Sequence, residues 1–246
     1  MGITKKNKAF IPVILFIIAA SIVAVVYYAQ DWSAKKKVSK IEIAGNELLT
    51  EKEVVSIVED SVISKKKDDI DMISLAGLLE ENSYIKNAYI SFSGSESINI
   101  EIIERKPVAY LVKDNGELVF VDDDMAMMPF RIIDFRQNEI PLLRNILNDG
   151  KLDSLAMSNA LNILNSIKKY KNEMYGEISE VIYESRDMFS FILKKHGLKV
   201  KAGNADDMKY KLFKLSKVMD LIYTDKDIYN SEYIDLRWEG QIVIRS

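Results

Sequence analysis

Three consecutive aspartates, Asp122-Asp123-Asp124, could supply carboxylate ligands to a divalent cation. An EF-hand loop spaces its oxygen ligands, places Gly at its sixth position and ends on Glu at its twelfth. Met127 and Met128 follow the aspartates here instead. We therefore predict no metal site. We assign Met125–Met128 to the edge of a core, with an apolar contact surface as the alternative.

Acid–base and nucleophilic chemistry finds little support in the sequence. There is no cysteine, and the one histidine, His196, stands in a Lys-Lys-His-Gly segment typical of a turn. Phosphate-binding glycine loops, the G-x-S-x-G nucleophile elbow and the H-E-x-x-H zinc motif do not occur. We therefore predict no catalytic residue, no cofactor and no enzymatic turnover.

The final segment, "YIDLRWEGQIVIRS" over 233–246, carries residue types suited to protein recognition. It alternates as a strand, and three apolar side chains share one face: Ile234, Leu236 and Trp238. The other face takes the polar side chains of Asp235, Arg237 and Glu239, until Gly240 permits a bulge or tight bend. Arg and Trp are enriched at interface hot spots, and an open strand edge can accept a peptide as a further strand. We predict a partner-binding edge strand, with an inward-packed Trp238 as the alternative.

A protein that acts by binding a partner needs other elements to hold the C-terminal segment in place. The first such element along the chain is a long apolar segment near the N-terminus. Residues 9–30, "AFIPVILFIIAASIVAVVYYAQ", are 22 consecutive residues without a charge, whereas about 20 cross the ~30 Å core of a bilayer as a helix. We predict a transmembrane helix over 9–30. A cleavable signal peptide with its processing site at Ala19-Ala20-Ser21 is the alternative, which the apolar run continuing to Tyr28 disfavours.

Charge limits the possible partners without orienting the span. Lysines flank it on both sides in similar number, so the positive-inside rule is close to a tie; they are Lys5, Lys6 and Lys8 before it and Lys35, Lys36, Lys37 and Lys40 after it. Beyond the first eight residues the chain carries 31 basic and 37 acidic side chains, a net charge of −6. This balance disfavours nucleic acid as a partner.

Residues 38–106 alternate between strand and helix patterns. The segment "VSKIEIAGN" predicts a strand with a Gly-Asn stop, and Thr50 and Glu53 form a T-x-x-E capping box before a short amphipathic helix. A solvated loop at Lys65–Asp69, a second helix around Leu75–Leu79, and two alternating strands about a turn at Gly94 follow. The predicted order is strand, helix, helix, strand, strand.

Residues 107–246 are predicted to be rich in β structure, with two longer helices and a C-terminal strand. Asn115-Gly116 suits the two positive φ angles of a type I′ hairpin turn. A helix of about fifteen residues follows Pro141, and a meander of strands comes next. Asn204 is the predicted cap of the last helix. That helix presents a solvated basic face, or one for acidic partners or lipid headgroups, made of Lys209, Lys211, Lys214 and Lys217. The fold class is therefore α+β.

The chain resembles the bacterial cell-division family FtsQ/DivIB in two stretches. "VSKIEIAGN" and "YIKNAYISFSGSESINIEIIERKPVAYLV" are similar to the opening and close of that family's POTRA domain. The Glu-Arg-x-Pro-hydrophobic-Ala junction at Glu104–Ala109 leads in that family into a second, β-rich domain. The resemblance implies a cytoplasmic tail at 1–8, the transmembrane helix at 9–30, a POTRA domain at 38–106 and an FtsQ-type β domain at 107–246.

The same resemblance implies a function through contact. It describes a single-pass scaffold of the cell inner membrane at the division septum, with its C-terminal domains outside the cytoplasm, which recruits FtsB-like and FtsL-like single-span proteins. It places the partner contact near the C-terminus, where we expect Tyr233, Arg237, Trp238, Gly240, Gln241 and Ile242 to contribute. Trp238 stands where many relatives have Tyr.

Two other functions remain open from the sequence. A POTRA-containing protein can serve as an adaptor in envelope protein transport or assembly, although such domains usually occur in tandem before a barrel. An anchored extracytoplasmic enzyme would need a convergent polar cluster that the sequence does not show.

Overall fold

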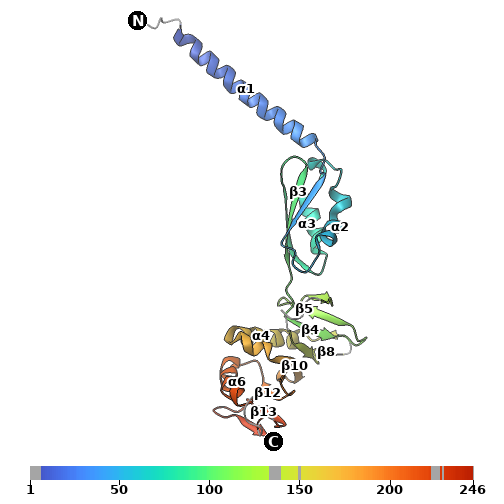
Figure 1. Ribbon diagram of the computed structural model, residues 1–246, viewed down its shortest axis with the longest axis vertical. Coiled ribbons are helices and arrows are strands. Elements are labelled where there is room, and N and C mark those ends of the chain that lie inside the picture. The colour runs from blue at the N-terminus through green and yellow to red at the C-terminus, as the bar shows by residue number, and fades with distance from the viewer. Residues whose placement is uncertain (1–6, 133–139, 149–150, 223–227, 229, 246) are drawn as a thin grey trace. The chain divides into compact units, whose positions relative to one another are not determined.

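The computed structural model describes residues 7–132, 140–148, 151–222, 228 and 230–245 (Figure 1). The chain divides into two compact units, Met1–Glu104 and Arg105–Ser246, and each contains its own sheet. The architecture is mixed α+β with an apolar N-terminal helix and a large sheet, as predicted.

The N-terminal helix α1 spans Asn7–Lys35 and so extends beyond the predicted 9–30 at both ends. Its stretch Pro12–Ala29 is long and apolar enough to cross a membrane, and the side chains of this stretch are exposed. Exposed apolar surface of this extent is unfavourable in water and favourable in hydrocarbon. The helix is consistent with a single-pass membrane protein.

The first unit also holds a three-stranded sheet and two α-helices in the predicted order. Their bounds are β1 (Lys40–Ala44), α2 (Glu51–Val62), a 3₁₀ turn (Lys67–Asp69), α3 (Met72–Glu80), β2 (Ile85–Phe92) and β3 (Ser97–Glu104). β3 is the central strand, parallel to β1 and antiparallel to β2. Ile98, Ile100 and Ile102 alternate along β3 and are at most 2% exposed, so they form the centre of the core.

The start of α2 follows from its local sequence. The Thr50 Oγ1 accepts the Glu53 N–H at 3.3 Å, and the Glu53 carboxylate accepts the Thr50 N–H at 2.8 Å. This confirms the predicted capping box, which satisfies two N–H groups that the helix itself leaves unpaired.

The loop after β1 is tied to the end of β3 by one buried carboxylate. Glu104 is 7% exposed, and its carboxylate accepts the backbone N–H groups of Glu47, Leu48 and Leu49 at 3.0, 2.6 and 2.8 Å. Gly45 enters this loop with φ +83°, and a Cβ there would lie 2.0 Å from the Ile102 carbonyl oxygen. The loop therefore needs both a glycine and an acceptor at these positions.

The second unit is built on a nine-stranded sheet in the order β14-β13-β12-β11-β10-β7-β4-β5-β6. Its strands are β4 (Ala109–Val112), β5 (Leu118–Val121), β6 (Met127–Pro129), β7 (Leu142–Arg144), β10 (Ile178–Ser185), β11 (Met188–Leu193), β12 (Lys199–Gly203), β13 (Tyr233–Asp235) and β14 (Val243–Arg245). A separate pair comprises β8 (Leu147–Asn148) and β9 (Lys151–Leu152).

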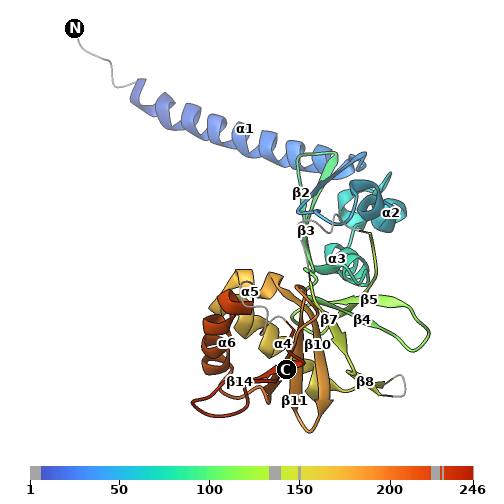
Figure 2. The same ribbon diagram turned by 60° about the horizontal axis from the view of Figure 1, so that its bottom comes forward.

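Helices α4 (Ser154–Tyr170), α5 (Asn172–Gly176) and α6 (Met208–Ile222) pack on one face of this sheet (Figure 2). Alternate strand residues such as Phe191, Val200 and Ile234 are buried beneath them. The residues between these, Lys199, Lys201 and Tyr233, belong to the opposite face and are only half-buried. The helices therefore cover one face, and the other holds charged side chains.

The predicted hairpin at Asn115-Gly116 is present, but its turn type differs. Gly116 has φ +82°, whereas Asn115 is not among the residues with positive φ. The Lys113 and Glu117 backbones pair across the turn at 2.8 Å, and the Gly116 N–H donates to the Lys113 carbonyl at 2.8 Å. A three-residue loop with glycine in the left-handed position replaces the two-residue type I′ turn.

Candidate partner-binding edge

The C-terminal segment is a hairpin and not the single strand that its alternation predicts. β13 ends at Asp235, a turn follows over Leu236–Ile242, and β14 returns antiparallel with Ile234 opposite Ile244. β13 lies between β12 and β14. β14 is the outermost strand at this end of the sheet in the described part of the chain, so the edge is formed by Val243–Arg245 rather than by the Tyr233–Asp235 stretch.

Side-chain positions in this hairpin depart from strict alternation. Ile234 and Leu236 are buried, but Trp238 is 58% exposed, so the alternative of an inward-packed Trp238 is wrong. The alternation predicts Asp235 on the polar face with Arg237 and Glu239, but Asp235 is buried, at 3% exposed. The turn explains the first difference, because the strand ends before Trp238 and no longer fixes its side.

Arg237 accounts for the burial of Asp235. Its Nε lies 2.9 Å from one carboxylate oxygen, a terminal nitrogen lies 2.6 Å from the other, and its backbone N–H donates at 3.0 Å. Burial raises the pKa of Asp235, but these hydrogen bonds outweigh it and hold the pKa below its usual range. The pair therefore stabilises the fold at neutral pH, and this contribution is lost as the pH falls below the ordinary carboxyl pKa of about 4.

A pocket of about 370 Å³ opens beside Arg237 on the sheet face that carries no helix of the described chain. Lys199 pairs with Glu184 there at 2.7 Å, and the Lys201 ammonium lies 3.3 Å from the centre of the Tyr233 ring. Tyr233, one of the predicted contacts, is thus half-buried under a cation. Three cationic side chains line the pocket, and β13 separates its strands from the edge strand β14. It is lined by Glu184, Ser185, Met188, Phe189, Ser190, Lys199, Lys201, Gly203 and Arg237.

The remaining predicted contacts lie in the turn. Gly240 has φ +67°, which confirms the predicted tight bend, and Gln241 is exposed. Ile242 is partly buried and packs against the core of the second unit. The hairpin therefore gathers the six predicted residues, with Arg237, Trp238, Gly240 and Gln241 exposed and Tyr233 and Ile242 half-buried.

Gly203 lies directly beneath Arg237. It has φ +77°, and a Cβ there would lie 3.1 Å from the Arg237 Cγ. We expect Gly203→Ala to displace the guanidinium from Asp235 and to cost about 1–3 kcal/mol of stability in the second unit. Gly197→Ala is the matched control, because Gly197 has φ +63° and open space around it. Hydrogen exchange of β12 and β13 in the full chain measures both, and equal effects would refute the role of the contact.

The aspartate run belongs to a structural turn. The three carboxylates lie within 4.8 Å of one another, but Asp122 is buried and its carboxylate already accepts three groups. These are the Arg105 guanidinium at 2.8 Å and the backbone N–H groups of Asp124 and Ala126 at 3.0 and 2.8 Å. The arrangement fixes the turn between β5 and β6. Of the methionines that follow, Met128 is buried and Met127 is 40% exposed.

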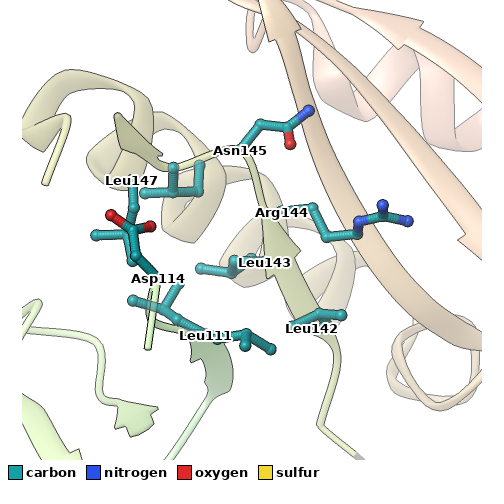
Figure 3. A pocket seen from close by; sticks show the side chains of 9 residues that line it. Leu111, Asp114, Leu142, Leu143, Arg144, Asn145 and Leu147 are labelled. Carbon is teal, nitrogen blue, oxygen red and sulfur yellow. The ribbon is translucent and has the colours of Figure 1, made fainter. Parts of the chain in front are cut away.

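A second cavity, of about 250 Å³, lies where β4 and β7 separate after their single bridge (Figure 3). Leu111, Leu143 and Leu147 contribute apolar side chains, and Asp114 lies at one side. The Arg144 side chain points toward β10, where it pairs with Glu180 at 3.0 Å. Among the described residues that line this cavity, no acid and base converge.

Two lysines of α6 that the sequence pattern predicts to be solvent-exposed are buried. Lys211 is 9% and Lys214 is 6% exposed, so the predicted basic face of α6 is wrong at both positions. Asn204 is also not the helix cap, because α6 begins at Met208 and the Asn204 side-chain oxygen accepts from the Lys211 ammonium at 2.8 Å. One signal was available, since Lys211 has the helical spacing of the buried Met208, Leu215 and Val218.

The fold and this edge define an α+β protein with an apolar N-terminal helix and, among its described residues, an open strand edge in the hairpin that exposes Arg237 and Trp238. Residues 106–244 match the family described as FtsQ/DivIB, C-terminal related. The chain therefore belongs to the FtsQ/DivIB family.

Individual relatives carry cell-division names. The chain is 30% identical over 173 residues to "Cell division protein DivIB" of Bacillus subtilis (strain 168), which covers 70% of this chain and 63% of the relative. It is 27% identical over 185 residues to the DivIB of Listeria monocytogenes, at 73% and 62% coverage. It is 21% identical over 218 residues to "Cell division protein FtsQ" of Geobacter sp. (strain M21), at 85% and 76%. The chain spans less than two thirds of the two DivIB relatives.

Proposed function

We propose that this protein is a membrane-anchored scaffold of the bacterial division machinery that binds other division proteins through the edge at β14. The family membership and the division names of the relatives support the cellular role. The observation that carries the binding mode is the open edge of β14 beside the exposed Arg237 and Trp238.

In this proposal each part of the chain has a separate task. Residues 1–8 are a cytoplasmic tail, 9–30 span the inner membrane, and 38–106 form a POTRA domain that contacts further division proteins. Residues 107–246 form the β domain that binds an FtsB-like partner, which is itself associated with an FtsL-like one. Both domains lie outside the cytoplasm at the septum, and the function involves no turnover.

The proposed contact has a backbone part and a side-chain part. Val243–Arg245 have one described neighbour strand, so the far side of β14 can pair with an incoming extended segment. Trp238 offers a large exposed ring, and Arg237 keeps 41% of its side chain exposed while it holds Asp235. A partner strand therefore meets a hydrogen-bonding edge flanked by an aromatic ring and a cation.

We expect Arg237→Glu to weaken capture of an FtsB-like partner by at least about 30-fold, as loss of a hot-spot cation does. The matched control is Arg144→Glu, because Arg144 is also exposed and also paired with an acidic side chain, here Glu180, but lies on β7. Binding of the full chain in detergent micelles to the immobilised partner measures both. Arg237→Glu also leaves Asp235 unpaired, so Trp238→Ala provides a second variant that breaks no described ion pair. Unchanged capture by both variants would refute this site.

The cellular role can be tested apart from the site. Depletion of the protein is expected to block septation and give filamentous cells. Normal division with defective envelope protein assembly would instead support the transport adaptor. Protease protection on intact cells determines which side of the membrane the C-terminal domains occupy.

A further inference from the structure

Lys214 is a buried ammonium that the fold places under the C-terminal hairpin. It lies in the middle of α6 and is 6% exposed, although lysine side chains usually reach water. Burial lowers the pKa of Lys214, while the charges of Asp235 and Glu239 oppose this. A cation in such a position destabilises the protein unless nearby groups satisfy it.

Three backbone carbonyls of the hairpin turn satisfy this ammonium. The Lys214 Nζ lies 2.6 Å from the Leu236 oxygen, 2.6 Å from the Trp238 oxygen and 3.2 Å from the Gln241 oxygen. An ammonium has three N–H donors, so each of them has an acceptor here. Hydrogen bonds from a charged donor are roughly twice as strong as neutral ones.

The turn has little other internal support. Among the described residues 237–242, local backbone support besides the β13–β14 ladder is confined to one turn at Glu239-Gly240. Gly240 supplies one left-handed residue, and the side-chain contacts of Arg237 lead to Asp235 beneath. The converging carbonyls are therefore arranged around the cation rather than around one another.

Lys211 makes the same kind of contact one turn earlier in α6. Its Nζ donates to the backbone and side-chain oxygens of Asn204, both at 2.8 Å. Asn204 follows Gly203, which lies against Arg237. Lys211 thus binds the loop after β12, and Lys214 binds the turn that contains Arg237.

We propose that Lys214 is a positioning residue whose ammonium holds the 236–242 turn closed and thereby sets the pairing of β14 and the exposure of Trp238. The structural part of this inference stands without a partner. Its consequence for binding rests on the proposed function of the edge.

The test compares Lys214→Met with Lys217→Met in the full chain in detergent micelles. Both changes remove one ammonium from α6, but Lys217 is exposed and contacts only the Phe213 ring among its described contacts. We expect Lys214→Met to accelerate hydrogen exchange of the Leu236 amide and of β14 by at least about tenfold. The β10–β11 ladder should exchange as before, and Lys217→Met should change neither region.

Chemical rescue separates the ammonium from general packing. The natural chain has no cysteine, so Lys214→Cys creates a unique thiol. Alkylation of the unfolded variant with bromoethylamine, which forms a C–S bond with loss of bromide and the thiol proton, restores an ammonium of nearly lysine length. Carbamidomethylation gives a neutral side chain instead. After refolding, we expect only the aminoethylated protein to recover slow exchange in β14.

The outcomes distinguish this inference from the proposed function. Unchanged exchange in Lys214→Met, or equal recovery with both alkylating agents, would overturn the positioning role. A wild-type chain that fails to capture an FtsB-like partner would overturn the proposed function and leave the exchange result valid. If both hold, Lys214→Met should weaken capture although the partner does not touch the buried ammonium.

Discussion

Among glycine-to-alanine substitutions at the described glycines, Gly45→Ala is expected to cause the largest loss of stability. The new Cβ would lie 2.0 Å from the Ile102 carbonyl oxygen, which belongs to the central strand, and φ at this position is +83°. Backbone on both sides must move, because no flexible side chain can yield. We expect a loss of about 3–5 kcal/mol in the stability of this unit.

Gly94→Ala is the matched control for this variant. Gly94 has φ +84°, nearly the same angle, but nothing lies within 4 Å of an added Cβ. Gly94→Ala therefore lowers stability only because alanine must adopt a left-handed backbone conformation, which costs about 1–2 kcal/mol. Since a chain with two units lacks a single well-defined midpoint, hydrogen exchange resolved to β1–β3 is the suitable measurement. Similar exchange in both variants would show that the close approach to Ile102 is not decisive.

The second large effect is expected from Glu104→Gln. The carboxylate accepts three backbone N–H groups, whereas a glutamine keeps one oxygen acceptor and turns an NH₂ donor toward the same N–H groups. Loss of charge-assisted hydrogen bonds with a buried donor left unpaired costs roughly 2–4 kcal/mol.

Glu101→Gln is the control for Glu104→Gln. Glu101 lies on the same strand β3 but is exposed, so its change should stay within about 0.5 kcal/mol. Exchange of the Leu48 and Leu49 amides reports the Glu104 contact directly. If these amides exchange equally slowly in both variants, the carboxylate is not what holds the loop.

Features encoded by neighbouring residues were predictable. The Thr50–Glu53 capping box closes over three residues, and the alternation of Ile98, Ile100 and Ile102 marks one face of a strand. The predicted position of the hairpin at Asn115-Gly116 is also confirmed. Its turn type is not, because the choice between two-residue and three-residue loops depends on how the flanking strands pair.

Features that depend on distant residues could not be read from the segment itself. The Tyr233–Ser246 segment indicates a strand with a bend at Gly240, but it gives no sign that Lys214 binds carbonyls of this turn, 22 to 27 positions later in the chain. The sequence predicts an exposed lysine at this position because most lysines are exposed. The burial of Asp235 has a similar origin, since it requires Arg237 to fold back across it.

The junction motif is a further feature that depends on distant residues. The Glu104-Arg105 pair is part of the resemblance to the family, and the local sequence gives no reason for either charge. The structure gives each residue a partner in its own unit, the loop after β1 for Glu104 and Asp122 for Arg105. Neither partner is near in sequence, so local patterns could not supply the reason.

The parallel pairing of β1 with β3 has a mechanical meaning. Lys40–Ala44 follow the apolar helix and run alongside Ser97–Glu101, whose strand β3 ends at Glu104, directly before the second unit begins. Tension applied between the membrane and the second unit would pull these neighbours along their length in opposite directions, so the ladder would be sheared with all its rungs loaded together instead of being unzipped one by one. The three-stranded sheet is thereby suited to bear a pull between α1 and the second unit.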